Sequence, residues 1–289
     1  MGLRSLLAPK RKILAFNLLF GSFFISNNLG SRCFCSAFIR EIESTAKSSF
    51  SLRPSGKHIS MISESVDPVA ELGLPSPIML GSGSFTRKLI LKEMNVKFEL
   101  LVMPIDEKGI GDRSDGANAS ELVTLLAKAK GDHIVQSFLN ESEKYANLKG
   151  KEFIVLTGDQ VVVQGTKILE KPTDINEAKQ FVRSYGDCSP RTVGACALTH
   201  VPSLTQVIGF DTAQINFKES ISEDGDKLID RLLEDSAPVL SCAGGLMVEH
   251  PFVREFIESI DGTEDSVMGL SKDLVLKLLK DLKEKLKLP

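Results

Sequence analysis

From residue 77 to residue 286, short apolar segments alternate with longer amphipathic segments, and this alternation restricts the fold more than any other feature of the chain. The expected strands are apolar runs bounded by turn residues, at 77–81, 98–103, 153–157, 160–164, 192–201 and 205–217. The expected helices carry apolar residues at helical spacing, at 85–95, 120–138, 173–185, 222–234 and 271–286. Strands that alternate with helices predict an α/β fold.

Composition excludes several classes of protein. The chain has 289 residues, of which 42% are hydrophobic and 25% are charged, so collagen-like, coiled-coil and wholly disordered classes are excluded. Three of its five cysteines lie beyond residue 60, at wide spacing: Cys188, Cys196 and Cys242. We therefore expect neither a disulfide framework nor a zinc site, and the four histidines show no metal-ligand spacing.

Charge divides the chain at about residue 60. Residues 1–60 hold nine basic and two acidic residues, which leaves 26 basic and 36 acidic residues in 61–289. The first part is rich in Arg and Ser and has no acidic residue before Glu41, which is typical of a mitochondrial or plastid transit peptide. The acidic remainder argues against a nucleic-acid partner, because phosphates require a basic face.

Other interpretations of the first sixty residues remain open. The apolar run 13–25, followed by the small residues Ser36 and Ala37, also resembles a secretory signal. A membrane anchor would need about 20 apolar residues, and this run is too short, so we expect no membrane partner. Translation from Met61 would give a cytoplasmic protein. We expect a leader at 1–60, a polar linker at 61–76 and one domain at 77–289.

The first candidate site segment, 82–88, joins an expected strand to an expected helix. Ser82 and Ser84 are small hydroxyl residues at a helix N-terminus, where backbone N–H groups and the helix dipole favour an anion. Arg87 and Lys88 follow on the first helical turn and could reach phosphate oxygens. The segment lacks the spacing of a Walker A loop. The alternative interpretation is a capped helix with surface cations.

The other candidate segments carry carboxylates next to expected strands. Asp159 follows the strand 153–157 and is placed to hold a metal or to activate water, or else is an ordinary turn residue. Glu107 and the pair Glu170–Lys171 lie in comparable positions. Carboxylates of this kind suit Mg²⁺, which prefers one or two of them together with substrate phosphates. The combination indicates phosphoanhydride chemistry.

The order of these motifs resembles the Maf family of nucleoside triphosphate pyrophosphatases over residues 77–286. The shared motifs are S-x-S with a basic helix start, Asp-Glu after the second strand, A-x-A-K, G-D-Q, E-K-P and A-G-G-L-M-V-E. The resemblance implies a two-lobed, Maf/inosine-triphosphatase-like α/β fold with a mixed twisted sheet and a central cleft, usually in a homodimer. It also implies cleavage of a nucleotide between its α- and β-phosphates with a divalent metal, Mg or Mn.

The resemblance assigns roles to individual residues. Asp159 matches the proposed catalytic acid/base, and Glu107 with Asp159 matches the carboxylates near the metal. The phosphate-facing residues correspond to Ser82, Ser84, Arg87, Lys130 and Lys171. Cations placed where negative charge develops stabilise the leaving pyrophosphate.

Three further positions bear on the nucleotide base: Thr86, Gln160 and Glu249. Gln160 and Glu249 match the 7-methyl-GTP branch of the family, whereas Thr86 stands where that branch has an aromatic residue. A Glu carboxylate can accept from both N–H groups on the guanine edge. We expect removal of modified nucleotides such as 7-methyl-GTP, a house-cleaning activity. The alternatives are a dTTP/UTP pyrophosphatase and a non-catalytic nucleotide-binding regulator of cell division.

Overall fold

The computed structural model describes residues 66–140 and 145–288. The expected leader at 1–60, and with it the expected transit peptide, lies outside the described residues. No helix in the described ranges has the length and apolar character that crossing a membrane requires.

A mixed sheet of seven strands forms the centre of the described chain, in the order β2-β1-β3-β5-β6-β7, with β4 paired to β3. The strands are β1 (Ile78–Leu80), β2 (Phe98–Leu100), β3 (Phe153–Gln164), β4 (Lys167–Leu169), β5 (Arg191–Val201), β6 (Gln206–Phe217) and β7 (Ile257–Asp261). β1 runs parallel to β2 and β3, and the other pairs are antiparallel. The expected α/β class is confirmed.

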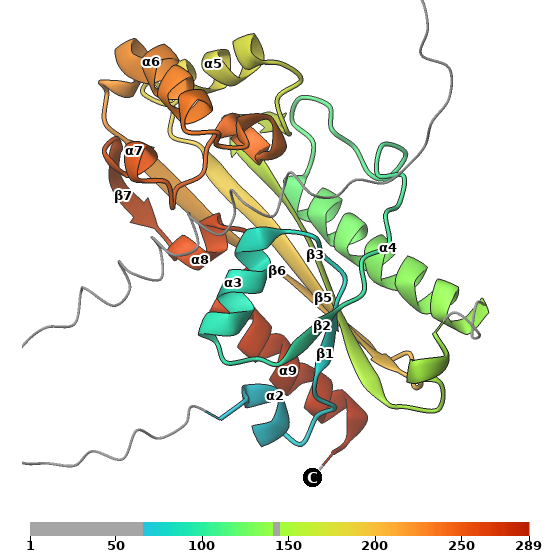
Figure 1. The fold of residues 1–289 in the computed structure, drawn as a ribbon. Helices are drawn as coiled ribbons and strands as arrows, with labels where there is room; N and C mark the ends of the chain where they lie inside the picture. Colours follow the sequence, from blue (N-terminus) through green and yellow to red (C-terminus); the bar gives the residue numbers. More distant parts are fainter. Residues whose placement is uncertain (1–65, 141–144, 289) are drawn as a thin grey trace, which may run out of the picture. The chain divides into compact units, whose positions relative to one another are not determined.

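Helices cover both faces of this sheet (Figure 1). The α-helices are α2 (Pro68–Glu71), α3 (Phe85–Glu93), α4 (Ala119–Asn140), α5 (Ile175–Ser184), α6 (Ile221–Glu234), α7 (Pro251–Arg254), α8 (Glu264–Val267) and α9 (Lys272–Leu286). Three short 3₁₀ helices are η1 (Ala146–Leu148), η2 (Val239–Ser241) and η3 (Ala243–Gly245).

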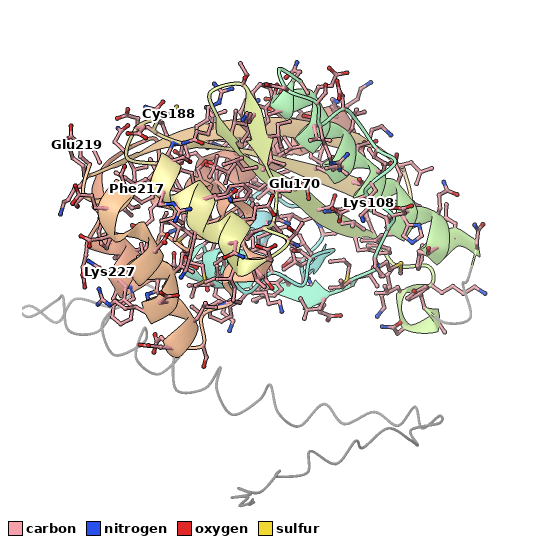
Figure 2. All side chains as sticks on the ribbon, turned by 90° about the horizontal axis from the view of Figure 1, so that it is seen from above. Lys108, Glu170, Cys188, Phe217, Glu219 and Lys227 are labelled. Atoms are coloured by element: carbon pink, nitrogen blue, oxygen red, sulfur yellow. The ribbon has the colours of Figure 1, made fainter. Side chains whose placement is uncertain are left out.

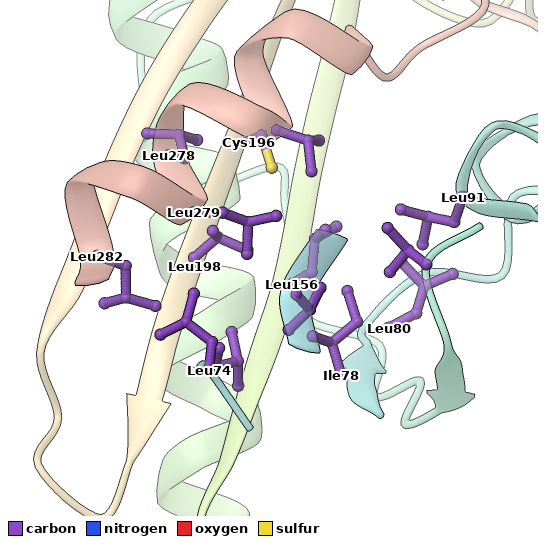
Figure 3. Close-up of a cluster of buried hydrophobic side chains, with 14 of the residues drawn as sticks. Leu74, Ile78, Leu80, Leu91, Leu156, Cys196, Leu198, Leu278, Leu279 and Leu282 are labelled. Carbon is purple, nitrogen blue, oxygen red and sulfur yellow. The ribbon is translucent and has the colours of Figure 1, made fainter. Parts of the chain in front are cut away.

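Side chains of β3 alternate between the two faces, as a strand requires. Phe153 and Val155 pack with Ile134 of α4. Ile154 and Leu156 point to the other face and pack with residues of α3 and α9 (Figure 3). β3 therefore contributes to two layers of core. Among the described helices, α4 covers one face of the central part of β3 and β5.

Two cores share the face opposite α4, one at each end of the long strands. The first contains β1, α3 and α9 and is the cluster drawn in Figure 3. The second contains α5 and α6 and the end of β6. Seen from above in Figure 2, Phe217 lies beside these two helices, and its ring stacks on Tyr185 with 5.5 Å between the ring centroids.

The structure differs from the sequence-based expectations in several elements. The expected strands 153–157 and 160–164 form one strand, β3, and Gly158 and Asp159 pair with Cys196 and Ala195 of β5, so Asp159 lies within the strand and not in a turn after it. The short elements α2, α7, α8, β4 and β7 were not expected. Part of the expected linker is folded: Val69 of α2 and Leu74 are buried in the core with α9. The apolar residues of this segment are interspersed with polar residues and Pro over too few turns to give a clear helical period, so the sequence does not reveal the buried pair.

Candidate functional site

Several of the candidate site residues, among them Asp159, Lys130 and Arg87, lie along an open edge of β3. On this edge β1 pairs with β3 at Val155 and Leu156, and β4 pairs with it from Val162 to Gln164. Between them, residues 157–161 have a strand partner only on the other side, in β5. β1 ends here, and the loop that follows it leads into α3. The site is thus built at the carboxyl end of a parallel strand, the usual place for function in α/β sheets.

One lysine joins two carboxylates at this edge. The Nζ of Lys130 lies 2.5 Å from Oδ1 of Asp159 and 2.9 Å from Oε1 of Glu107. The side chains of Lys130 and Asp159 are 16% and 14% exposed, whereas that of Glu107 is 46% exposed. The side chains of Lys130 and Asp159 are therefore held by packing, whereas the carboxylate of Glu107 contacts Lys130 from the exposed loop after β2.

α4 can hold Lys130 against Asp159 because it approaches β3 closely. Thr157, fully buried on β3, donates a hydrogen bond of 2.7 Å from Oγ1 to the carbonyl oxygen of Ala127. A Cβ added at Gly131 would lie 3.2 Å from Oγ1 of Thr157 and 3.3 Å from Oγ1 of Thr199. Glycine at this position keeps the helix near the strand one residue after Lys130.

Arg87 of α3 contacts the open edge of β3 from the side opposite α4. Its Nη1 donates to the carbonyl oxygen of Gly158 at 2.8 Å and to Oγ of Ser82 at 3.3 Å. Its Nε donates to the carbonyl oxygen of Gly269 at 2.9 Å. Burial lowers the pKa of Arg87, and the carboxylate of Asp159 opposes this effect. The guanidinium therefore ties three segments together beside Asp159.

The two serines expected to face phosphate are engaged within their own loop. Ser84 is the N-cap of α3, and its Oγ accepts from the backbone N–H of Arg87 at 3.4 Å. Ser82 accepts from the N–H of Ser84 at 3.2 Å, and Oγ of Ser84 lies 2.9 Å from Oγ1 of Thr86. The alternative interpretation, a capped helix, describes Ser84 in this structure, and phosphate binding by both serines stays a prediction.

Asp159 and Gln160 point to opposite faces of the sheet. Asp159 faces α4, whereas Nε2 of Gln160 donates to the carbonyl oxygens of Ser266, at 2.8 Å, and Val267, at 3.2 Å, in α8. The amide nitrogen of Gln160 is thus used within the protein, which leaves Oε1 as the group that it can offer to a base. A nucleotide that meets both residues must lie along the edge of β3.

Lys171 and Glu249 lie close enough to Cys242 for their charges to act on its thiol. Burial raises the pKa of Cys242 to about 12; the charge of Glu249 acts in the same direction and that of Lys171 opposes it. Burial also raises the pKa of Glu249, and the nearby Glu264 adds to this. The backbone N–H of Gly244 donates to the carbonyl oxygen of Glu170 at 3.0 Å, which joins the E-K-P and A-G-G motifs.

The loop that carries Glu107 also contains Arg113, which was not among the expected site residues. The segment 101–118, between β2 and α4, contains no helix or strand, and loops of this length are usually functional. Within it, Arg113 binds Glu170 and the backbone at Glu107. The contact of its Nε with Oε1 of Glu170 and that of its Nη2 with the carbonyl oxygen of Glu107 both measure 2.9 Å. A pocket of about 390 Å³ adjoins it, with Arg113, Glu170 and Lys171 among its lining residues. The sequence feature that could have pointed to Arg113 is an arginine within a long loop without regular structure.

The carboxylates could hold one divalent metal with the help of a substrate. Within residues 66–140 and 145–288 no group of three or more His, Cys, Asp or Glu side chains is placed to hold a metal. Glu107 and Asp159 form a pair around Lys130, and Mg²⁺ prefers one or two carboxylates plus substrate phosphates and water. The residue types fit such a metal, with the remaining ligands supplied by a nucleotide.

Comparison with known proteins shows to which family the chain belongs. The chain is 29% identical to the 7-methyl-GTP pyrophosphatase of Dictyostelium discoideum, over 72% of this chain and 98% of the relative. It is 28% identical to the dTTP/UTP pyrophosphatase of Desulforamulus reducens, over 67% and 90% respectively. It is also 28% identical to a nucleoside triphosphate pyrophosphatase of Prochlorococcus marinus, over 67% and 91%. The family model described as Maf-like protein matches residues 77–282. The chain therefore belongs to the Maf-like protein family.

Proposed function

We propose that the chain is a nucleoside triphosphate pyrophosphatase, which cleaves its substrate between the α- and β-phosphates to give a monophosphate and pyrophosphate. The observation that carries this proposal is the contact of Lys130 with both Asp159 and Glu107 at the open edge of β3. This cluster brings together a general base, Asp159, a cation for phosphate oxygens, Lys130, and a second carboxylate, Glu107. The names of the three relatives support the same activity.

Each group has a task in this reaction. Asp159 accepts a proton from the attacking water, which general-base catalysis requires to lie within hydrogen-bond reach of the carboxylate. A divalent metal held by Glu107 and Asp159 would polarise the phosphate that is attacked. Lys130 and Lys171 contribute positive charge to the phosphate chain and the leaving pyrophosphate, usually the largest contribution to such catalysis. Arg87, bound to three carbonyl and hydroxyl oxygens, holds Gly158 and so the position of Asp159.

We propose that the preferred substrate is 7-methyl-GTP, with UTP and dTTP as the alternative. Glu249 supports a guanine base, because its carboxylate can accept from two N–H donors where uracil and thymine offer one. Oε1 of Gln160 is likewise an acceptor. The 29% identity to a 7-methyl-GTP pyrophosphatase and the 28% identity to a dTTP/UTP pyrophosphatase differ too little to decide.

Finer properties of the molecule are also proposals. The cores at the two ends of the long strands support a two-lobed molecule with the substrate between the lobes. We propose a homodimer in mitochondria or plastids, or in the cytoplasm when translation begins at Met61. The basic, acid-poor composition of residues 1–60 supports import.

A panel of triphosphates tests the activity and the base preference. The full chain is incubated with Mg²⁺ or Mn²⁺ and, in turn, 7-methyl-GTP, GTP, UTP, dTTP and ATP, and pyrophosphate release is measured. We expect 7-methyl-GTP to be turned over well above UTP and dTTP. Binding of nucleotides without turnover would favour the non-catalytic regulator, although such a protein has no need of the Lys130–Asp159–Glu107 cluster.

The same panel with Glu249→Gln tests the base preference separately. An amide can still accept one hydrogen bond but cannot accept from two guanine donors equally well, so we expect the ratio of 7-methyl-GTP to UTP turnover to fall. Glu258→Gln is a matched control, because it makes the same substitution at an exposed position of β7. An unchanged ratio in Glu249→Gln would contradict base recognition by Glu249.

A further inference from the structure

The side chain of Arg113 fastens the loop 101–118 to the segment after β4. Its Nε donates to Oε1 of Glu170 at 2.9 Å, its Nη1 to the carbonyl oxygen of Ile110 at 2.6 Å and its Nη2 to the carbonyl oxygen of Glu107 at 2.9 Å. The side chain of Arg113 is 21% exposed, whereas that of Glu170 is 55% exposed. All three nitrogens of the guanidinium are therefore engaged.

The two ends of this link adjoin two groups of the candidate site. One end is the backbone of Glu107, whose side chain binds Lys130 beside Asp159. The other end is Glu170, and the next residue is Lys171. A backbone hydrogen bond of 3.0 Å, from the N–H of Gly116 to the carbonyl oxygen of Thr166, joins the same loop to the turn between β3 and β4.

We propose, on the basis of the proposed function, that Arg113 is a positioning residue: it holds the carboxylate of Glu107 and the ammonium of Lys171 at a fixed separation across the substrate phosphates. Glu107 is half exposed on a loop without regular structure, so its own pairing with Lys130 is too solvent-accessible to fix it. The planar guanidinium suits this task, because its donors are held in a rigid fork that one lysine ammonium cannot reproduce.

The ion pair and the two carbonyl contacts have separable effects. Glu170→Gln removes the charge at one end and leaves both contacts to the loop backbone. Arg113→Lys keeps the charge and loses the fork. Arg113→Ala loses all three contacts. If the guanidinium of Arg113 positions Glu107, the loss of activity increases in the order Glu170→Gln, Arg113→Lys, Arg113→Ala. The positive charge that Arg113→Lys retains does not restore the activity.

Two measurements on the full chain test this proposal. The first is hydrogen exchange of the backbone amides in 105–118, which needs no substrate. The second is steady-state hydrolysis of 7-methyl-GTP or UTP, with KM, kcat and the Mg²⁺ concentration for half activity measured separately. Arg183→Ala is the matched control, because Arg183 makes a comparable ion pair with Asp226, between α5 and α6, with bonds of 2.7 and 2.8 Å.

We expect Arg113→Ala to speed exchange in 105–118 at least tenfold and to raise the half-activating Mg²⁺ concentration and KM several-fold, with the thermal unfolding midpoint close to that of the wild type. Arg183→Ala should change none of these. Unchanged exchange and kinetics in Arg113→Ala, or full rescue by Arg113→Lys, would overturn the proposal. A wild-type chain that hydrolyses no triphosphate would refute the proposed function instead, and the exchange measurement would still decide whether Arg113 fixes the loop.

Discussion

The ammonium of Lys130 on α4 lies 2.5 Å from the carboxylate of Asp159 on β3 and also binds Glu107 at 2.9 Å. The positive charge of the shared ammonium offsets the repulsion between the two carboxylates. A bound triphosphate brings further negative charge, which Lys130 is placed to meet. This arrangement underlies the predictions that follow.

Replacement of Asp159 by Asn should abolish turnover and leave nucleotide binding intact. The amide keeps the shape of the side chain but cannot accept the proton of water, and loss of a general base typically costs about 10²- to 10⁴-fold in rate. Turnover is measured by pyrophosphate release and binding by calorimetry. Asp226→Asn, at the ion pair between α5 and α6, is the control and should stay active. An active Asp159→Asn protein would reject Asp159 as the base.

Glu107→Gln should increase the amount of metal that the enzyme requires. Glu107 is one of the two carboxylates proposed to hold the divalent ion, and an amide is a weaker oxygen ligand. Titration of activity with Mg²⁺ after treatment with a chelator should give a half-activating concentration several-fold above that of the wild type. Glu121→Gln, at the exposed start of α4, should leave the titration unchanged. Full activity of the wild type in excess chelator would contradict a role for the metal.

Arg87→Lys should destabilise the folded chain even without substrate. A lysine cannot reach the carbonyl oxygens of both Gly158 and Gly269, and each buried polar group left unpaired costs about 1–3 kcal/mol. Urea unfolding measures this loss. Arg183→Lys changes an exposed ion pair, so we expect a loss of at most about 1 kcal/mol there. Equal losses in the two variants would show that Arg87 does not fasten the edge of β3.

The stability of the chain should depend on pH through Glu249. Burial raises the pKa of Glu249 above its ordinary value of 4.5, so its ionised form is disfavoured in the folded state. The stability that the neutral carboxyl provides is complete below pH 4.5 and is lost as the pH rises through the raised pKa. The unfolding free energy of Glu249→Gln, relative to the wild type, should therefore increase from pH 4 to pH 7. A difference that does not change with pH would contradict the burial of this charge.

Much of the fold follows from local patterns in the sequence. The N-caps Ser84, Asp174 and Ser271 precede long amphipathic helices, so the starts of α3, α5 and α9 lie within about two residues of the expected positions. α2, β4 and β7 could not be predicted, because elements of three to five residues give no periodicity and form only against the core or a neighbouring strand.

The candidate site, like the fold, could be predicted from the sequence only in part. A Gly-Asp pair after a buried strand marks Asp159, but strand pairing makes β3 continuous through it, which no local pattern reveals. The partnership of Lys130 with Asp159 depends on how closely α4 approaches β3, and this depends on Gly131 and Thr157. The contact of Arg113 with Glu170 joins segments far apart in the sequence, so it appears only in the fold.

The products of the reaction test the central claim most directly. A purified full-length chain is incubated with Mg²⁺ and either 7-methyl-GTP or UTP, and nucleotides and phosphates are separated and quantified over time, with Asp159→Asn as the blank. We expect equal amounts of the nucleoside monophosphate and pyrophosphate, and neither product from Asp159→Asn. Release of a nucleoside diphosphate with orthophosphate, or the absence of hydrolysis with every triphosphate, would contradict the proposed pyrophosphatase.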